Sequence, residues 1–219
     1  MKKQAMFVFV LTALVTFSTF GSATAQEIVE PNRLESDLNY TIQIAPTDST
    51  NARQLILDPS FEAYSPNPFW NEYSAAIDSP LCNYLCGVGT GTGPRSGDIW
   101  AWFGGFYSGD TASLSQSVII PAGFPKLSFW VEQVVCNGDG ASNYLKLTID
   151  DEEIWRTDSS DSACGVLGYR PVTLDVSNYA DGGTHEIKFY SATINLANFF
   201  VDDVELYTGV EIFLPLALK

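Results

Sequence analysis

The stretch that decides the fold runs from residue 145 to residue 155 and reads LKLTIDDEEIW. Leu145, Leu147 and Ile149 alternate with polar residues, and such alternation is typical of a β-strand with one buried face. An acidic run follows, and apolar side chains resume at Ile154 and Trp155. The pattern predicts two antiparallel strands joined by a tight turn.

The same alternation recurs along most of the remaining chain. No segment shows a sustained helical period, and the region 59–97 is rich in Pro, Gly, Asn and Ser, which indicates loops. About eight to ten short strands without helices predict an all-β fold in which two antiparallel sheets form a sandwich. Besides the hairpin, strands are expected at 40–44, 54–58, 114–120, 127–135, 172–176, 186–190 and 199–207.

The first 25 residues have the composition of a secretory signal peptide. Lys2 and Lys3 precede an apolar run, and the segment ends in Ala23-Thr24-Ala25, which fits a cleavage site. We expect cleavage after Ala25 and a location that is secreted, extracellular or at the cell surface. An uncleaved anchor is the alternative, although the apolar run is short for a membrane span. No later segment is apolar enough to span a membrane.

The predicted signal peptide, residues 1–25, is followed by three further parts. An irregular N-terminal leader is expected at 26–50, the β-sandwich domain at 51–208 and an apolar C-terminal tail at 209–219. The tail contains Ile212-Phe213-Leu214-Pro215-Leu216. It is either an extra edge strand, where proline is tolerated, or an exposed sorting or docking segment.

The charge balance restricts the partners. The chain has 26 acidic and 11 basic residues and a formal net charge of −15. Loss of the signal peptide removes two of the lysines, and the mature chain is then more acidic by two charges. So acidic a chain disfavours nucleic acid and anionic membranes as partners.

The chain contains four cysteines, and an even number in an exported protein indicates disulfides. Of the three pairings, we favour Cys82 with Cys86, which would close a local turn, and Cys136 with Cys164. A zinc site made by all four cysteines is the alternative. Zinc sites usually combine pairs of closely spaced cysteines, and only Cys82 and Cys86 are close in sequence.

Aromatic residues are the strongest candidates for ligand binding. Trp100 and Trp102 share one face of an expected strand, Tyr107 lies just beyond it, and Trp70 and Tyr73 lie in the predicted loop region. Flat aromatic rings stack on the apolar faces of sugars, while polar groups at the rim fix the orientation. Core packing is the alternative, and we favour it for Trp100 and Trp102. A disulfide in the same loop region would either order a binding rim or only staple the turn.

Catalysis has little support in the sequence, and we expect no enzyme. The only histidine is His185, in phase with the apolar residues of an expected strand. The nucleophile motif G-x-S-x-G and the zinc motif H-E-x-x-H are both missing. The acidic runs have the composition of solvated turns, whereas a glycosidase acid is normally buried.

Four segments together carry a resemblance to a known family. They read LDPSFE at 57–62, IWAWFGG at 99–105, ASLSQSV to LSFW at 112–130 and FVDDVEL at 200–206. Over roughly residues 54–208 the chain resembles the galactose-binding-like jelly-roll superfamily. Within it, the chain is similar to carbohydrate-binding-module-like and MAM-like accessory domains of bacterial secreted proteins. The resemblance implies a jelly roll and a structural Ca²⁺ held by Glu62 and by Asp203 or Asp202.

These observations predict a secreted, non-catalytic binding module. Its expected ligand is a carbohydrate at or outside the cell envelope. The alternative is a protein-interaction, adhesion or structural module of a cell-surface assembly, whose partner would be a cell-surface protein. The step from the fold to carbohydrate rests on analogy.

Overall fold

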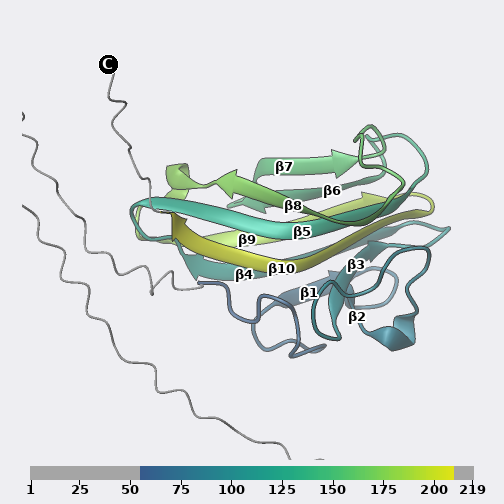
Figure 1. Cartoon of the computed structure of the whole chain (residues 1–219), viewed down its shortest axis with the longest axis horizontal. Helices are drawn as coiled ribbons and strands as arrows, with labels where there is room; N and C mark the ends of the chain where they lie inside the picture. Colours follow the sequence, from purple (N-terminus) through teal and green to yellow (C-terminus); the bar gives the residue numbers. More distant parts are fainter. Residues whose placement is uncertain (1–54, 210–219) are drawn as a thin grey trace, which may run out of the picture. The chain divides into compact units, whose positions relative to one another are not determined.

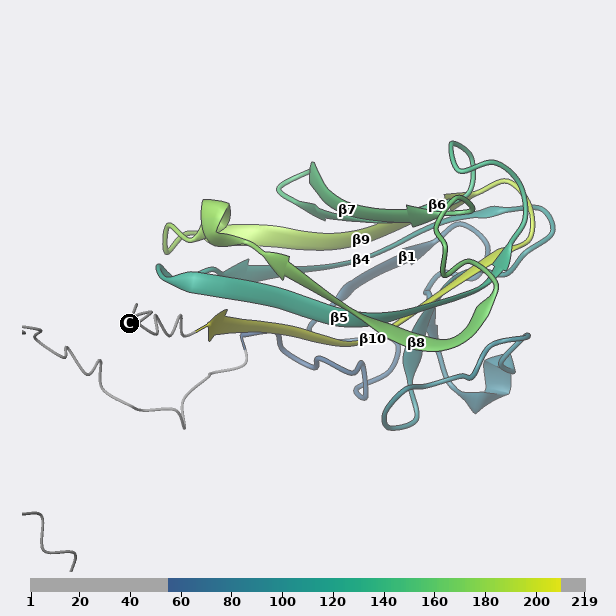
Figure 2. The ribbon, with the colours of Figure 1, turned by 45° about the horizontal axis from the view of Figure 1, so that its top comes forward.

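Ten β-strands form two antiparallel sheets in residues 55–209, the part of the chain that a computed structural model describes (Figure 1). The two sheets lie one over the other as separate layers (Figure 2). Sheet A has the order β1 (Asn71–Ser74), β4 (Asp110–Ile119), β9 (Thr184–Thr193), β6 (Tyr144–Ile149) and β7 (Glu152–Asp158). Sheet B has the order β2 (Leu81–Cys82), β3 (Trp100–Gly104), β10 (Ala197–Gly209), β5 (Phe124–Cys136) and β8 (Val166–Asp175).

The predicted all-β sandwich is therefore confirmed. Two 3-10 helices, η1 (Tyr84–Cys86) and η2 (Ser177–Tyr179), are the only helical segments within residues 55–209. No helix in this range is long and apolar enough to cross a membrane. The predicted signal peptide, the leader with its strand at 40–44, and the apolar tail beyond residue 209 lie outside the described residues.

The core between the sheets is made of the inward-facing side chains of the alternating strands. In β6, Leu145, Leu147 and Ile149 are fully buried, as their alternation predicts. Phe129 of β5 packs edge-on against Phe189 of β9, with 5.1 Å between the ring centroids. Aromatic pairs of this geometry add to the stabilisation that burial alone provides.

The predicted hairpin is also confirmed. β6 pairs with β7, with Leu145 opposite Thr157 and Leu147 opposite Trp155. Asp150 and Asp151 form the turn with positive φ angles of 50° and 66°. Aspartate tolerates this left-handed backbone better than most residues, which explains why an acidic pair can stand at this turn.

Two corrections concern the region before β3. Residues 55–58 do not form the predicted strand, although Leu55 N–H donates to the Leu206 carbonyl of β10 at 3.1 Å. Conversely, the region predicted as loops contains β1 and β2. The two strands have only four and two residues, too few for an alternating period to be recognised.

Both disulfides pair as predicted. Cys82 is bonded to Cys86 and Cys136 to Cys164, with Cα–Cα distances of 5.8 and 5.9 Å that suit such bridges. None of the four thiols is free, and the zinc alternative is therefore excluded.

Sheet B is apolar on both faces, because it supports a second, smaller core on its outer side. Ala101 and Phe103 of β3 face the main core, whereas Trp100 packs outward with Phe200 and Cys82. The loop 87–98 covers this outer cluster. At Gly91 an added Cβ would lie 2.1 Å from the Phe200 ring, so only glycine allows the backbone to pass so close.

Buried carboxylates hold this loop against sheet B. Glu132 is 1% exposed and accepts hydrogen bonds from the Thr92 backbone at 3.0 Å and the Thr92 hydroxyl at 2.9 Å. Asp202 is fully buried and accepts from the backbone N–H groups of Arg95 and Ser96 at 2.7 and 3.1 Å. Buried polar groups need hydrogen-bond partners. Here the carboxylates of sheet B serve as acceptors for the loop, and the N–H and hydroxyl groups of the loop serve as donors to the carboxylates.

A β-bulge explains where Asp202 and Asp203 point. The pairing of β10 with β5 shifts register between Asp202 and Glu205, and Asp203 has a φ of 49°. The bulge changes the phase of the strand, so that Asp202 lies on the outer face with Phe200 while Val204 faces the main core. Simple alternation would instead place Asp202 on the same face as Val204, and that expectation is wrong.

The loop anchors give a test of stability. We expect Glu132→Ala to lower the free energy of unfolding by about 1–3 kcal/mol, because it leaves buried N–H donors without an acceptor. Urea denaturation measures the change. Glu205→Ala, at an exposed glutamate of β10, is the control and should stay within about 0.5 kcal/mol of the wild type. Equal stabilities of the two variants would show that the loop does not need its anchor.

Candidate functional site

Two of the five predicted ligand-binding aromatics are core residues. Trp70 is 3% exposed, packs edge-on against Phe61 at 5.3 Å and donates from Nε1 to the Asp58 carbonyl at 3.0 Å. Trp100 is fully buried in the outer cluster of sheet B. A ring without an exposed face cannot stack on a ligand, so the binding role predicted for Trp70 is wrong, while the core packing favoured for Trp100 is confirmed.

The other three predicted aromatics reach the surface but lie apart. Tyr73 is half exposed and belongs to β1 of sheet A. Trp102 is partly buried on the outer face of sheet B, and Tyr107 is highly exposed in the connection from β3 to β4. The predicted set therefore does not form one site, and Tyr73 lies on sheet A, apart from Trp102 and Tyr107.

On the outer side of sheet A, one line of paired residues crosses all five strands. Tyr73 pairs with Ser113, and Ser113 pairs with Tyr190. Tyr190 is then opposite Lys146, which is opposite Arg156. We call the outer side of sheet A the tyrosine face and define it by Tyr73, Tyr144, Tyr190, Lys146, Arg156 and Lys188.

Side chains alternate between the two faces of a strand. The strands that bury one set of side chains in the core therefore point the other set outward, and this outward set forms the tyrosine face. In β9, Ile187 and Phe189 are buried between the sheets, and Lys188 and Tyr190 therefore point outward. β4 contributes only Thr111, Ser113, Ser115, Ser117 and Ile119 to this side. Small hydroxyl side chains thus form the floor between Tyr73 on one side and Tyr190 on the other.

The surface is hollowed beside Tyr190. A cavity of about 360 Å³ is lined by Tyr144, Lys146, Thr148, Asp151, Lys188 and Tyr190. The rings of Tyr144 and Tyr190 have centroids 6.3 Å apart and are inclined by 39°. Neither tyrosine was among the predicted ligand-binding residues. The alternation of a single strand shows only that such a position faces solvent.

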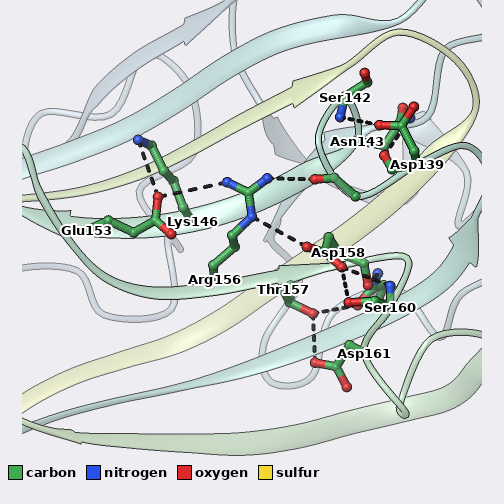
Figure 3. Close-up of polar contacts among 12 residues, drawn as sticks. Asp139, Ser142, Asn143, Lys146, Glu153, Arg156, Thr157, Asp158, Ser160 and Asp161 are labelled. Carbon is green, nitrogen blue, oxygen red and sulfur yellow. Dashed lines mark hydrogen bonds and ion pairs between the residues drawn. The ribbon is translucent and has the colours of Figure 1, made fainter.

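Ion pairs hold the long side chains of this face in place (Figure 3). Lys146 lies 3.7 Å from Glu153, and Arg156 lies 3.4 Å from Asp158 and donates to the Gly140 carbonyl at 2.6 Å. The Arg156 guanidinium also stacks 3.8 Å from the centre of the Tyr144 ring. Arg156 therefore has three contacts that limit its rotamers, and Lys146 is held by Glu153 with its ammonium group 5.7 Å from the centre of the Tyr190 ring.

Lys188 is fixed in the same way. Hydrogen bonds to the carboxylates of Glu186 and Asp151 raise the pKa of its ammonium group, and the Asp151 contact is 3.0 Å.

The Asp158 carboxyl, by contrast, has a lowered pKa, mainly because the hydroxyl and the backbone N–H of Ser160 donate to it. It stays ionised near neutral pH. The tyrosine face therefore offers stacking surfaces and fixed hydrogen-bonding groups, and Asp158 is not suited to act as a general acid.

His185 belongs to neither surface. Its Nδ1 is 2.7 Å from Asp150 and its Nε2 is 3.0 Å from Asp181. Both ring nitrogens are thus engaged by carboxylates, and the residue links the β6–β7 turn to the segment before β9. The hydrogen bond to Asp150 raises the pKa of His185 most, and the hydrogen bond to Asp181 raises it further.

The acids predicted to bind calcium accept hydrogen bonds from the loop before β3. Glu62 accepts from the backbone N–H groups of Asp98 and Ile99 at 3.1 Å. Asp203 pairs with the guanidinium of Arg95 and accepts from the Ser96 hydroxyl. Burial raises the pKa of Asp202 to about 7. Residues 55–209 contain no cluster of three or more His, Cys, Asp or Glu side chains that could hold a metal ion. All three acids are engaged by hydrogen bonds with the segment 95–99.

The comparisons with known proteins concern the fold. No protein-family model matches the chain, and no curated protein matches it. A family 61 carbohydrate-binding module solved with β-1,4-galactotriose superposes with a TM-score of 0.51 at 19% identity, over 71% of this chain and 99% of the other. The fold is the jelly-roll β-sandwich of carbohydrate-binding modules. The resemblance predicted from the sequence is thereby confirmed for the fold.

Two further structures are similar over a comparable length. The K3 adhesin domain of Lys-gingipain from Porphyromonas gingivalis is 14% identical, with a TM-score of 0.45 over 71% of this chain and 98% of the other. A family 16 carbohydrate-binding module is 16% identical, with a TM-score of 0.41 over 72% of this chain and 99% of the other.

Calcium removal tests the assignment of the acidic residues. If Glu62, Asp202 and Asp203 serve as loop anchors, the melting temperature is the same in excess Ca²⁺ and in EDTA, and this is the result we expect. A calcium ion bound only by the native state would stabilise it by mass action. A melting temperature that rises with Ca²⁺ concentration would therefore restore the calcium site.

His185 predicts a pH dependence of stability. Its pKa is raised in the folded state, so its stabilising contribution is complete below the ordinary value of 6.5 and is lost as pH rises through the raised pKa. We expect the melting temperature to fall as the pH rises above the ordinary histidine value of 6.5. Thermal melts across this range should show a weaker fall in His185→Gln. Parallel curves for the two proteins would contradict the prediction.

Proposed function

We propose that this domain is a secreted, non-catalytic carbohydrate-binding module that holds a neutral glycan chain on the tyrosine face. The observation that carries the proposal is the line of residues across sheet A, in which two tyrosines alternate with hydroxyl and cationic side chains. Sugar sites combine these same elements, namely aromatic surfaces for stacking and a few fixed polar groups for orientation.

The spacing of the tyrosines sets the direction of the ligand. Tyr73 and Tyr190 lie on strands separated only by β4, so their backbones are about 10 Å apart at the usual strand spacing. Tyr144 continues the row beyond Tyr190. An extended glycan that crosses the strands would therefore place successive sugar rings over this row, whereas one parallel to the strands would meet a single tyrosine.

The ion pairs support binding by ordering the polar groups in advance. Lys146 and Arg156 remain about one quarter to one third exposed while they contact carboxylates. They can still donate to sugar hydroxyls, and Glu153 can accept from them. Side chains already held in place lose less entropy when a ligand binds.

The charge of the face favours a neutral ligand. Its three cations, Lys146, Arg156 and Lys188, are matched by Glu153, Asp158, Asp151 and Glu186. No excess positive charge is left to attract an acidic glycan, and the chain as a whole carries −15. Long-range repulsion would weaken the binding of uronate or sulfate groups.

The absence of catalysis and the export of the domain belong to the same proposal. The single histidine is engaged by two carboxylates away from the tyrosine face. Disulfides persist in oxidising compartments outside the cytosol, and this domain has two. The family 61 module was solved with β-1,4-galactotriose, so neutral galactans are the first glycans to test.

Replacement of the central tyrosine tests the proposal. We expect Tyr190→Ala to lower the affinity for a neutral oligosaccharide about tenfold or more, because truncation of a central aromatic contact costs more than about 1 kcal/mol. Isothermal titration calorimetry measures the affinity of the best ligand from a panel of neutral and acidic glycans. Tyr107→Ala removes an exposed tyrosine elsewhere and is the matched control. An affinity that falls with Tyr107→Ala but not with Tyr190→Ala would reject the tyrosine face.

A further inference from the structure

The most exposed apolar side chains gather at one place, away from the tyrosine face. Among the large apolar residues of the described region, Tyr107, Tyr84 and Leu85 are the three most exposed, at 86%, 78% and 76%. Tyr84 and Leu85 stand on η1, between the bonded cysteines 82 and 86. Tyr107 lies in a turn closed by the hydrogen bond from Gly109 N–H to the Phe106 carbonyl at 3.1 Å.

A hollow lies beside these protruding side chains. Its volume is about 360 Å³, and its lining consists of Ile77, Cys82, Cys86, Trp102, Gly104, Gly105 and Phe106. The one indole nitrogen in this lining, Nε1 of Trp102, already donates to the Asn198 amide oxygen at 3.3 Å. A sugar in this hollow would leave most of its hydroxyls without side-chain partners, and unpaired polar groups are costly to bury. The hollow therefore suits an apolar side chain.

The surrounding sequence carries no charge. Residues 79–94 and 99–109 contain no Asp, Glu, Lys or Arg, although the chain as a whole has a net charge of −15. Two copies of so acidic a protein repel each other over most of their surface. We call Tyr84, Leu85, Tyr107 and the hollow the disulfide patch. Apart from the exposed Asp78, which follows Ile77 of the lining, it is a region where two copies can meet without bringing like charges together.

We propose that the disulfide patch binds a second copy of this chain in a two-fold symmetric dimer. Tyr84 and Leu85 of each copy enter the hollow of the other. The patch carries both a protruding element and a hollow, which is the self-complementarity that a two-fold interface requires. The protruding pair is ordered before binding by the Cys82–Cys86 disulfide and by the Asn83 side chain, which accepts from Leu85 N–H at 2.9 Å. This order lowers the entropy cost of association.

Sedimentation equilibrium of the full chain, with both disulfides formed, tests the proposal directly. We expect a reversible monomer–dimer equilibrium between roughly 1 μM and 1 mM, little affected by the presence of glycan. Tyr84→Glu should abolish the dimer by placing a charge in the partner's hollow. Leu167→Glu, at a side chain that is 63% exposed elsewhere, should leave the dimer unchanged. A wild-type chain that is monomeric over the whole range overturns the proposal.

A mixing experiment tests the symmetry of the contact. Ile77→Glu alters the lining of the hollow at a residue that is 46% exposed, and it should also give monomers. A mixture of Tyr84→Glu with Ile77→Glu retains one of the two protrusion-and-hollow contacts, because one variant keeps its hollow and the other keeps its protrusion. Partial recovery of dimer in the mixture is the expected result. A dimer that survives either single variant would show that the contact lies elsewhere.

Discussion

The burial of sheet B on both faces is the constraint on which the rest of the structure depends. Trp100 and Phe200 would be open to water without the loop 87–98, and the loop stays in place because Glu132 and Asp202 accept its N–H groups. Hydrophobic burial supplies most of the driving force, while the buried carboxylates decide where the loop lies. The arrangement leaves sheet A as the layer whose outer side remains uncovered and able to meet a ligand.

The alternation of β6 and β9 was enough to predict the sandwich, because one buried face imposes a period of two on each strand. The burial of Trp70 could not be predicted, since this residue lies in a region whose Pro, Gly, Asn and Ser content indicates loops. The bulge at Asp203 reverses a phase that simple alternation would assign. Tyr144 and Tyr190 were missed for another reason: they form a row only through the pairing of separate strands, and one strand contains no information about its neighbours' register.

The ion pairs of sheet A contribute little to the free energy of folding. Partly exposed pairs are usually worth less than about 1 kcal/mol. Their effect on Lys146, Arg156 and Lys188 is geometric, because each long side chain keeps a limited set of rotamers. The recognition surface that we propose lies on regular strands instead of on loops, and strands hold their side chains with greater precision.

The outer sides of the two sheets point away from each other (Figure 2). A pair of chains joined through the disulfide patch would therefore carry two uncovered tyrosine faces on one particle. On a polysaccharide that repeats the same unit many times, the second face would bind at the high effective concentration created by the first. A modest affinity per face would then give long residence on an insoluble or branched polymer, together with fast exchange on short soluble fragments.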